Sequence, residues 1–180
     1  MGLIDEYRLA CYKKIGHLGE KGSLWLVQDS VSGKYFVMRE LTLENQEVYE
    51  RMRSLCHPNV VRIFEMLSVE GKIYAIEEYV KGQPLSGILE REGPLGRRAF
   101  SVGKQVLQAL AILHKNGIIH RDIKPGNIMM DEKGNIKLID FHIARILKED
   151  NERDTTIKGS RAYASPEQFG FKQTDCRADI

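Results

Sequence analysis

The chain has 180 residues, of which 42% are hydrophobic and 29% charged, a composition typical of a soluble globular protein. Its net charge of +2 is small and dispersed, which argues against nucleic acid or a membrane surface as a partner. The three cysteines are far apart and form neither a disulfide framework nor a zinc-binding spacing. Without a signal peptide or a long apolar run, the chain is expected to be cytoplasmic, with no membrane span and one or two small domains.

The N-terminal part is predicted to begin a small sheet. Residues 12–27 read as a strand, a glycine-rich turn and a second strand, because glycine permits a tight turn between two apolar runs. Residues 32–34 form the next turn, and residues 35–39 the third strand. Residues 1–10 show no clear pattern, so no element is assigned to them.

A helix and two further strands follow. The helix is capped at Thr42 and has an apolar stripe at i, i+4 and i+7, formed by Val48, Met52 and Leu55. Residues 60–64 and 73–77 read as strands on either side of a Glu-Gly turn.

The second half is predicted to be mainly helical. Pro84 suits the first turn of a short helix. A longer helix ends at Asn116, where Gly117 provides the stop signal. His114, near its end, has no second ligand at a metal-binding spacing, so a structural or surface role is favoured over a metal site.

The residues that suggest chemistry lie in two short runs. Residues 120–127 read H-R-D-I-K-P-G-N, and residues 139–142 read I-D-F-H. The apolar segments between the two runs flank a turn at residues 131–134, which predicts a hairpin. Because a hairpin returns the chain, we expect Asp140 to lie close to Asn127.

This arrangement would place two carboxylates, an amide and an ammonium group in one cleft. Phosphoryl transfer to a hydroxyl needs these groups. One carboxylate would orient the hydroxyl and accept its proton, while the other, with the amide, would hold Mg²⁺. The lysine would offset charge on the transferred phosphoryl group.

The sequence resembles the eukaryotic-type protein kinases from about Tyr12 to its last residue. The six defined positions at fixed spacing in H-R-D-x-K-P-x-N are a specific signal. The resemblance implies an α+β, two-lobe fold. Residues 1–80 would form an N-lobe with an antiparallel sheet and one helix, and residues 81–180 part of a mainly helical C-lobe. ATP and Mg²⁺ would be the cofactors and a protein the substrate.

The resemblance also implies roles for individual residues. Asp122 would be the catalytic base, Lys124 the catalytic lysine typical of the serine/threonine branch, and Asn127 and Asp140 the metal ligands. The positions implied to bind the nucleotide are Gly19, Gly22, Leu24, Val37, Arg39, Glu78, Val80 and Met129.

The sequence departs from the family pattern in the predicted N-lobe. Arg39 stands where a phosphate-binding lysine is expected, and the two residues are not interchangeable at a shaped site. The helix position that normally holds its glutamate partner is Val48, so Glu44 or Glu47 is expected to pair with Arg39. Glu77 occupies a usually apolar position and must find a partner or water.

Further departures lie in the predicted C-lobe. His142 replaces the glycine of D-F-G and is expected to need a strained or different backbone conformation. Thr155 and Thr156 stand where activating phosphorylation falls in the family, with Arg121 as the basic partner, but ordinary loop threonines are an equal alternative. Residues 159–167 resemble the segment that lies beneath a peptide substrate.

The chain ends where the family's central C-lobe helix would start, at Asp179, which in the family braces the H-R-D backbone. We therefore expect a fragment or a truncated product. The long helix before Asn116 would lose part of its packing partner and expose an apolar patch, which favours self-association.

Two functions remain open from the sequence. The first is an ATP-dependent serine/threonine protein kinase. The alternative is a pseudokinase that binds a nucleotide or a partner without turnover, which is favoured by Arg39, by His142 and by the missing C-terminal helices. A small-molecule phosphotransferase is a weaker third reading, because the peptide-docking segment is present.

Overall fold

A computed structural model of the chain describes residues 2–19, 23–147, 160, 162–169 and 174–180. The chain divides into two compact units. The sheet unit comprises Met1–Cys56 and Val61–Tyr79, and the helical unit comprises His57–Val60 and Val80–Ile180. None of the described helices combines the length and the hydrophobicity needed to cross a membrane.

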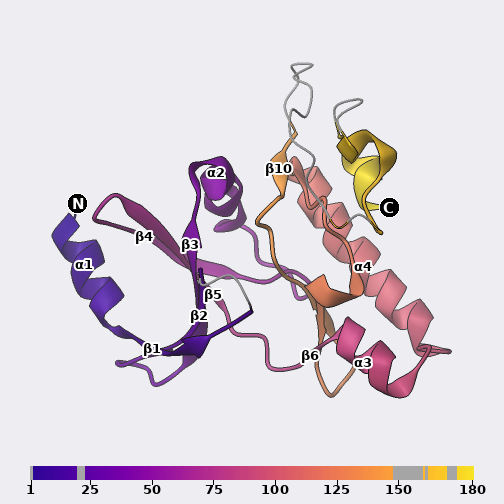
Figure 1. Ribbon diagram of the computed structural model, residues 1–180, viewed down its shortest axis with the longest axis horizontal. Coiled ribbons are helices and arrows are strands. Elements are labelled where there is room, and N and C mark those ends of the chain that lie inside the picture. Colours follow the sequence, from indigo (N-terminus) through magenta and orange to yellow (C-terminus); the bar gives the residue numbers. More distant parts are fainter. Residues whose placement is uncertain (1, 20–22, 148–159, 161, 170–173) are drawn as a thin grey trace. The chain divides into compact units, whose positions relative to one another are not determined.

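The sheet unit is built on an antiparallel five-stranded sheet with the order β1-β2-β3-β5-β4 (Figure 1). Its strands are β1 (Tyr12–His17), β2 (Leu24–Asp29), β3 (Tyr35–Leu41), β4 (Ile63–Val69) and β5 (Lys72–Glu78). The hairpin turns contain Gly33 and Gly71, both with positive φ, a conformation that glycine adopts without steric cost. The α+β class and the antiparallel sheet expected from the sequence are confirmed.

The sequence placed the fourth strand at residues 60–64, three residues too early. Val60, Val61 and Ile63 are buried and looked like parts of one strand, but of these three only Ile63 belongs to β4. Val60 instead forms an isolated parallel bridge with Leu138 in the helical unit. A short apolar run does not say which neighbour its residues will pair with.

The core of the sheet lies on one face and consists of Tyr12, Val27, Met38, Leu67 and Ile76. Helix α2 (Leu43–Met52) contacts β4 and buries Val48, Tyr49 and Met52, so the predicted helix is confirmed. The apolar residue Val48 therefore serves packing, which explains why it can replace a glutamate there.

A second helix of the sheet unit, α1 (Gly2–Ala10), was not expected from the sequence. It lies against β4 and contributes no fully buried residue. Arg8 attaches it instead, through hydrogen bonds of 3.0 and 3.2 Å from Nε to the Glu65 carboxylate and one of 2.8 Å to the Tyr12 hydroxyl. Leu9 also packs against the core of the sheet, and Asp5 accepts a hydrogen bond from the Ser68 nitrogen.

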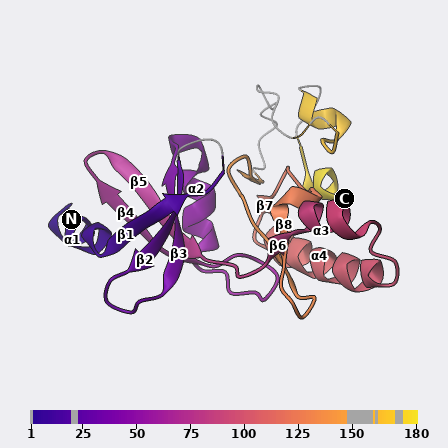
Figure 2. The same cartoon turned by 60° about the horizontal axis from the view of Figure 1, so that its bottom comes forward.

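Among its described residues, the helical unit contains the helices α3 (Leu85–Glu92) and α4 (Arg98–Lys115) and small sheets (Figure 2). A three-stranded sheet has the order β6-β8-β9, and β7 pairs with β10. The short strands are β6 (Gln83–Pro84), β7 (Ile118–Ile119), β8 (Ile128–Met130), β9 (Ile136–Leu138) and β10 (Arg145–Ile146). In the part of this unit that the structure describes, 3₁₀ turns lie at Pro125–Asn127, Pro166–Phe169 and Cys176–Asp179.

The predicted hairpin is confirmed as β8 and β9, with Ile128 opposite Leu138. Asp131 forms its turn by accepting hydrogen bonds from the backbone nitrogens of Lys133 and Asn135. After the hairpin, the Ile139 nitrogen donates to the carbonyl of Asn127 at 3.0 Å. This bond brings the segment that carries Asp140 back to the end of the H-R-D run.

Candidate active site

The backbone of the H-R-D run is fixed by one buried carboxylate. Asp179 accepts hydrogen bonds from the nitrogens of His120 at 2.9 Å and Arg121 at 2.7 Å. The same carboxylate lies 2.7 Å from Nε2 of His114. The expected brace is therefore confirmed, and His114 has the structural role that its spacing favoured.

His120 connects the run to the segment that carries Asp140. Its ring is fully buried, and burial lowers its pKa, so the imidazole is neutral near pH 7. Nε2 lies 3.1 Å from the Ile139 carbonyl and therefore donates, while Nδ1 accepts from the Asp122 nitrogen at 3.3 Å. The ring also packs on Phe141, with centroids 4.6 Å apart.

Asp122 lies at the centre of the hydrogen-bond network and is only 3% exposed. Its Oδ2 accepts from Nζ of Lys124 at 2.7 Å and from Nδ2 of Asn127 at 2.8 Å. Its Oδ1 accepts from the Ser160 nitrogen at 3.2 Å. Burial alone would raise the pKa of Asp122, but the hydrogen bonds from Lys124, Ser160 and Asn127 outweigh it and lower the pKa below its ordinary value.

Ser160 is a site residue that the sequence reasoning did not single out. Besides its backbone contact to Asp122, its hydroxyl lies 2.6 Å from Nζ of Lys124. Ser160 stands at the threonine of the family's G-T-P segment, so the alignment contained a signal for it. Lys124 thus bridges a carboxylate and a hydroxyl.

Asp140 approaches Asp122 as expected. One ligand atom each from Asp122, Asp140 and His142 lies within 4.8 Å of the others. Nδ1 of His142 is 2.9 Å from Oδ1 of Asp140. The carboxylates of the two runs therefore share one site within the helical unit.

Of the two alternatives expected for His142, the structure shows a different backbone conformation and not a strained one. In the described part of the chain, the non-glycine residues with positive φ are Glu70, Arg121 and Asp140, and His142 is not among them. Asp140, with φ of 66°, makes the turn itself. A short polar residue tolerates the left-handed region better than a bulky one, so no glycine is needed at position 142.

The residues suited to a magnesium ion are Asn127 and Asp140. Both hydrogens of the Asn127 amide are directed at Asp122, to its carbonyl and its carboxylate at 2.8 Å each. The amide oxygen therefore faces away from these bonds and is suited to a metal, as is the partly exposed Asp140 carboxylate. Oxygen donors of this kind fit the ion that the resemblance implies.

Arg39 has a partner that the sequence did not predict. Its Nε donates to Oε1 of Glu77 at 2.7 Å, and the two side chains are 11% and 4% exposed. Glu47, one of the two expected partners, lies 3.4 Å from Arg51 at the surface. Glu77 thus finds the partner that a buried charge needs.

The other positions implied to bind a nucleotide fall in both units. Gly19 has a positive φ of 76°, whereas Gly22 lies outside the described residues. Leu24 faces Arg39 in the β2–β3 register, and Val37 faces Glu77 in the β3–β5 register. Glu78 ends β5.

Val80 and Met129 belong to the helical unit, where Met129 pairs with Pro84 between β8 and β6. Thr155 and Thr156 lie outside the described residues, so the predicted phosphorylation sites receive no structural account.

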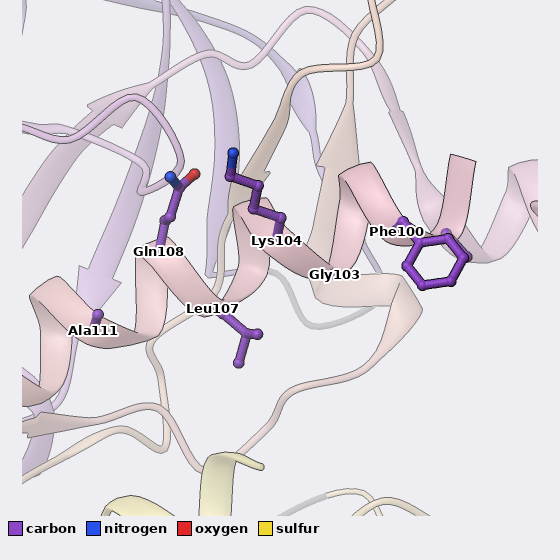
Figure 3. A pocket seen from close by; sticks show the side chains of 7 residues that line it. Phe100, Gly103, Lys104, Leu107, Gln108 and Ala111 are labelled. Carbon is purple, nitrogen blue, oxygen red and sulfur yellow. The ribbon is translucent and has the colours of Figure 1, made fainter. Parts of the chain in front are cut away.

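A shallow apolar hollow follows the surface of α4 (Figure 3). It is lined by Ala99, Phe100, Gly103, Lys104, Leu107, Gln108 and Ala111. Phe100 is 87% exposed and Leu107 57%. None of the residues of the site around Asp122 lines this hollow.

Comparison with known proteins agrees with this geometry. Residues 10–180 match the protein kinase domain family, and the chain belongs to that family. It is 35% identical over 174 residues to serine/threonine-protein kinase PrkC of Bacillus subtilis, an alignment that covers 90% of this chain and 27% of PrkC.

Two other relatives show how widely the similarity extends. The chain is 42% identical over 137 residues to the probable serine/threonine-protein kinase PknB of Bifidobacterium longum, covering 69% of this chain and 20% of that protein. It is 31% identical over 178 residues to serine/threonine-protein kinase STE20 of Candida glabrata. This alignment covers 93% of the chain and 19% of STE20. The chain thus spans less than a third of the length of each of these relatives.

Proposed function

We propose that this chain catalyses ATP-dependent phosphoryl transfer to serine and threonine hydroxyls of proteins. The observation that carries the proposal is the Asp122 site: a buried carboxylate kept ionised by three donors, with a second carboxylate, Asp140, beside it. Its relatives named as serine/threonine-protein kinases support the same substrate class.

In this proposal, Asp122 orients the substrate hydroxyl and accepts its proton as the oxygen attacks the terminal phosphoryl group. Its low pKa makes it a weak base, so orientation is the larger part of its role, as expected for a loose transition state. Lys124, 2.7 Å from Asp122, stabilises negative charge on the transferred group.

Asn127 and Asp140 would hold the magnesium ion. When bound, Mg²⁺ neutralises charge on the phosphate oxygens. The chain's own part is to keep the two oxygen donors in place: Asn127 through its bonds to Asp122, and Asp140 through the Ile139–Asn127 backbone bond just before it.

The nucleotide would be bound by an N-lobe at residues 1–80 and a C-lobe at residues 81–180. The proposal is supported by the two compact units and by Gly19, Leu24, Val37, Arg39 and Glu78, which all belong to the sheet unit. Gly22, Val80 and Met129 are proposed as further nucleotide contacts.

Transfer of radioactive phosphate from Mg-ATP to a generic basic protein tests the function. Asp122→Asn is expected to lower the rate by about 100- to 10,000-fold, the range typical of losing a catalytic acid or base. Asp175→Asn is the matched control, because Asp175 also pairs with a cation two residues later but is exposed. It should keep the rate of the unmodified chain.

Equal transfer by the unmodified chain and Asp122→Asn would contradict the proposal. No transfer by either, together with a rise in melting temperature on adding ATP, would instead support the pseudokinase alternative.

Self-association through the apolar surface of α4 is a further proposal, supported by the exposure of Phe100 and Leu107. Sedimentation of the chain and of Leu107→Lys tests it, because loss of an oligomer in the variant is expected. A cytoplasmic location is proposed from the free thiols of Cys11, Cys56 and Cys176 and from the need for ATP.

A further inference from the structure

We propose that His142 supplies a nitrogen ligand to the metal ion held at Asp140, so that this site binds a divalent transition-metal ion such as Mn²⁺ in preference to Mg²⁺. The proposal rests on the proposed function, since Asp140 is one of the two residues assigned there to the metal. The family pattern has glycine at position 142, which offers no side chain, so the pattern itself supplies no such donor.

The side chains that can reach one ion come from the two short runs of the helical unit. In the described part of the chain, Asp122, Asp140 and His142 each offer a ligand atom, and these atoms lie within 4.8 Å of one another. Nδ1 of His142 and Oδ1 of Asp140 are 2.9 Å apart. Two donors that bind one ion at about 2.1 Å and at right angles also lie about 3 Å apart, so this separation fits a shared ion.

The backbone allows a side chain at position 142. The turn after the hairpin has its positive φ, of 66°, at Asp140 and not at His142. The His142 side chain is 44% exposed and that of Asp140 is 26% exposed, so an ion from solvent can reach both. A carboxylate has two oxygens with several acceptor sites, so Asp140 can bind an ion and keep other contacts at the same time.

Asp122 is better suited to attract the ion than to bind it. Its side chain is 2% exposed, and its oxygens already accept hydrogen bonds from Lys124, Asn127 and the Ser160 nitrogen. Its negative charge nevertheless lies close to the other two ligand atoms and favours a divalent cation there. The role of Asp122 in orienting the substrate hydroxyl is therefore compatible with a metal ion beside it.

The kinds of donor atom decide which ion is favoured. An all-oxygen site made by Asp140 and Asn127 suits Mg²⁺, which prefers oxygen ligands in near-octahedral geometry. Imidazole nitrogen is a good ligand for first-row transition-metal ions, whereas Mg²⁺ is best suited by carboxylate, carbonyl and water oxygens. His142 should therefore strengthen the binding of Mn²⁺ and leave that of Mg²⁺ nearly unchanged.

Titration of the purified chain with Mn²⁺ in the absence of nucleotide, followed by electron paramagnetic resonance of the free ion, tests the proposal. His142→Ala is expected to weaken Mn²⁺ binding about ten- to a hundredfold, the range seen when the support of a metal ligand is lost. The affinity for Mg²⁺, measured by competition, should stay within about twofold, which is a small change on this scale. His57→Ala, the matched change at another histidine of the helical unit, should alter neither affinity.

The nitrogen ligand can also be observed directly. Mn²⁺ bound to the unmodified chain should show coupling to a nitrogen-14 nucleus in pulsed electron paramagnetic resonance, and His57→Ala should keep it. His142→Ala, saturated with Mn²⁺, should lack the coupling. Asp140→Asn should weaken the binding of both ions, because it changes the carboxylate that they share.

Nitrogen coupling that persists in His142→Ala, or an equal loss of affinity for the two ions in that variant, would overturn the proposal. The absence of coupling in the unmodified chain would overturn it as well and leave His142 with only a local hydrogen bond to Asp140. The proposed function would survive these results, because none of them measures phosphate transfer. Mn²⁺ binding through nitrogen by a chain that transfers no phosphate would instead support this inference and contradict the proposed function.

Discussion

The two units stabilise their buried charges in different ways. In the sheet unit, Arg39 and Glu77 form a direct contact between residues 38 positions apart. In the helical unit, Asp122 is held by several donors, two of which, Lys124 and Asn127, lie within five positions of it. The first arrangement departs from the family pattern at both residues, whereas the second keeps it.

The difference shows where a family pattern can change. A network built from neighbours in the sequence shares one carboxylate among several donors, so a change at any member disturbs the others. A contact across two strands can be exchanged for another if both members change together, because the register and not the residue type brings them close.

The largest effect on stability is expected from breaking the Arg39–Glu77 contact. Glu77→Ala should lower the free energy of unfolding by about 3–5 kcal/mol, because it removes one member of a buried ion pair. Lys124→Ala should cost only about 1–2 kcal/mol, since Asp122 keeps its bonds from Asn127 and Ser160. Urea unfolding measures both, and equal losses would remove the contrast between the units.

The next largest effect on stability is expected at Asp179, which is buried and whose hydrogen bonds to His114, His120 and Arg121 lie within the helical unit. Asp179→Ala should destabilise the chain by about 2–4 kcal/mol, because the backbone nitrogens of His120 and Arg121 lose their acceptor. Asp175→Ala, an exposed aspartate four positions earlier, should change the free energy of unfolding by less than about 1 kcal/mol. Thermal or urea unfolding of the two variants measures both changes. Similar losses of stability in the two would argue against a role for Asp179 in holding the backbone of His120 and Arg121.

A pH effect should separate the units as well, because His120 is buried in the helical unit with a lowered pKa. The unfolded chain binds the proton more readily, so the stability contributed by neutral His120 is present above its ordinary pKa of 6.5 and is lost as the pH falls below it. The slope is at most about 1.4 kcal/mol per pH unit for one proton.

Urea unfolding between pH 7.5 and 5.5 measures this slope, with His120→Gln as the comparison. The variant should show a smaller loss of stability over this range, since it cannot bind the proton. His57→Gln is a control because His57 lies outside the H-R-D run. If the free energy of unfolding of His120→Gln changed with pH as steeply as that of the unmodified chain, the lowered pKa of His120 would be contradicted.

The smallest effect is expected at Ser160. Ser160→Ala removes the hydroxyl that contacts Lys124 but keeps the backbone bond to Asp122. Phosphate transfer should therefore fall by no more than about tenfold, which corresponds to about 1.4 kcal/mol. Ser165→Ala serves as a control in the same segment. A loss as large as that of Asp122→Asn would give Ser160 a direct role in the reaction.

Much of the helical unit could be predicted because its signals are local. The stripe of α4, the β8–β9 hairpin and the spacing of Asp122, Lys124 and Asn127 all arise from residues a few positions apart. The position of Asp140 close to the H-R-D run could be predicted from the hairpin that precedes it. The alternatives at position 142 stayed open because the sequence does not reveal which residue of a turn adopts positive φ.

In the sheet unit, the strands could mostly be predicted, but the first helix, the start of one strand and the contact of Arg39 with Glu77 could not. Helix α1 was not expected, and the start of β4 could not be separated from the buried valines before it. The contact between Arg39 and Glu77 was not predicted, because two acidic residues on the next helix lay closer to Arg39 in the sequence. The register between β3 and β5 brings Arg39 close to Glu77. The alternation of side chains along the two strands does not determine this register by itself.

The sequence by itself determined the family, the α+β class and the short-range network of Asp122, Lys124 and Asn127, because neighbours along the chain constrain one another through local geometry. Only the tertiary structure decided that Glu77 holds Arg39 and that Ser160 reaches Asp122. Each of these contacts joins residues 38 positions apart, and strand pairing and packing, which no local pattern encodes, bring them together.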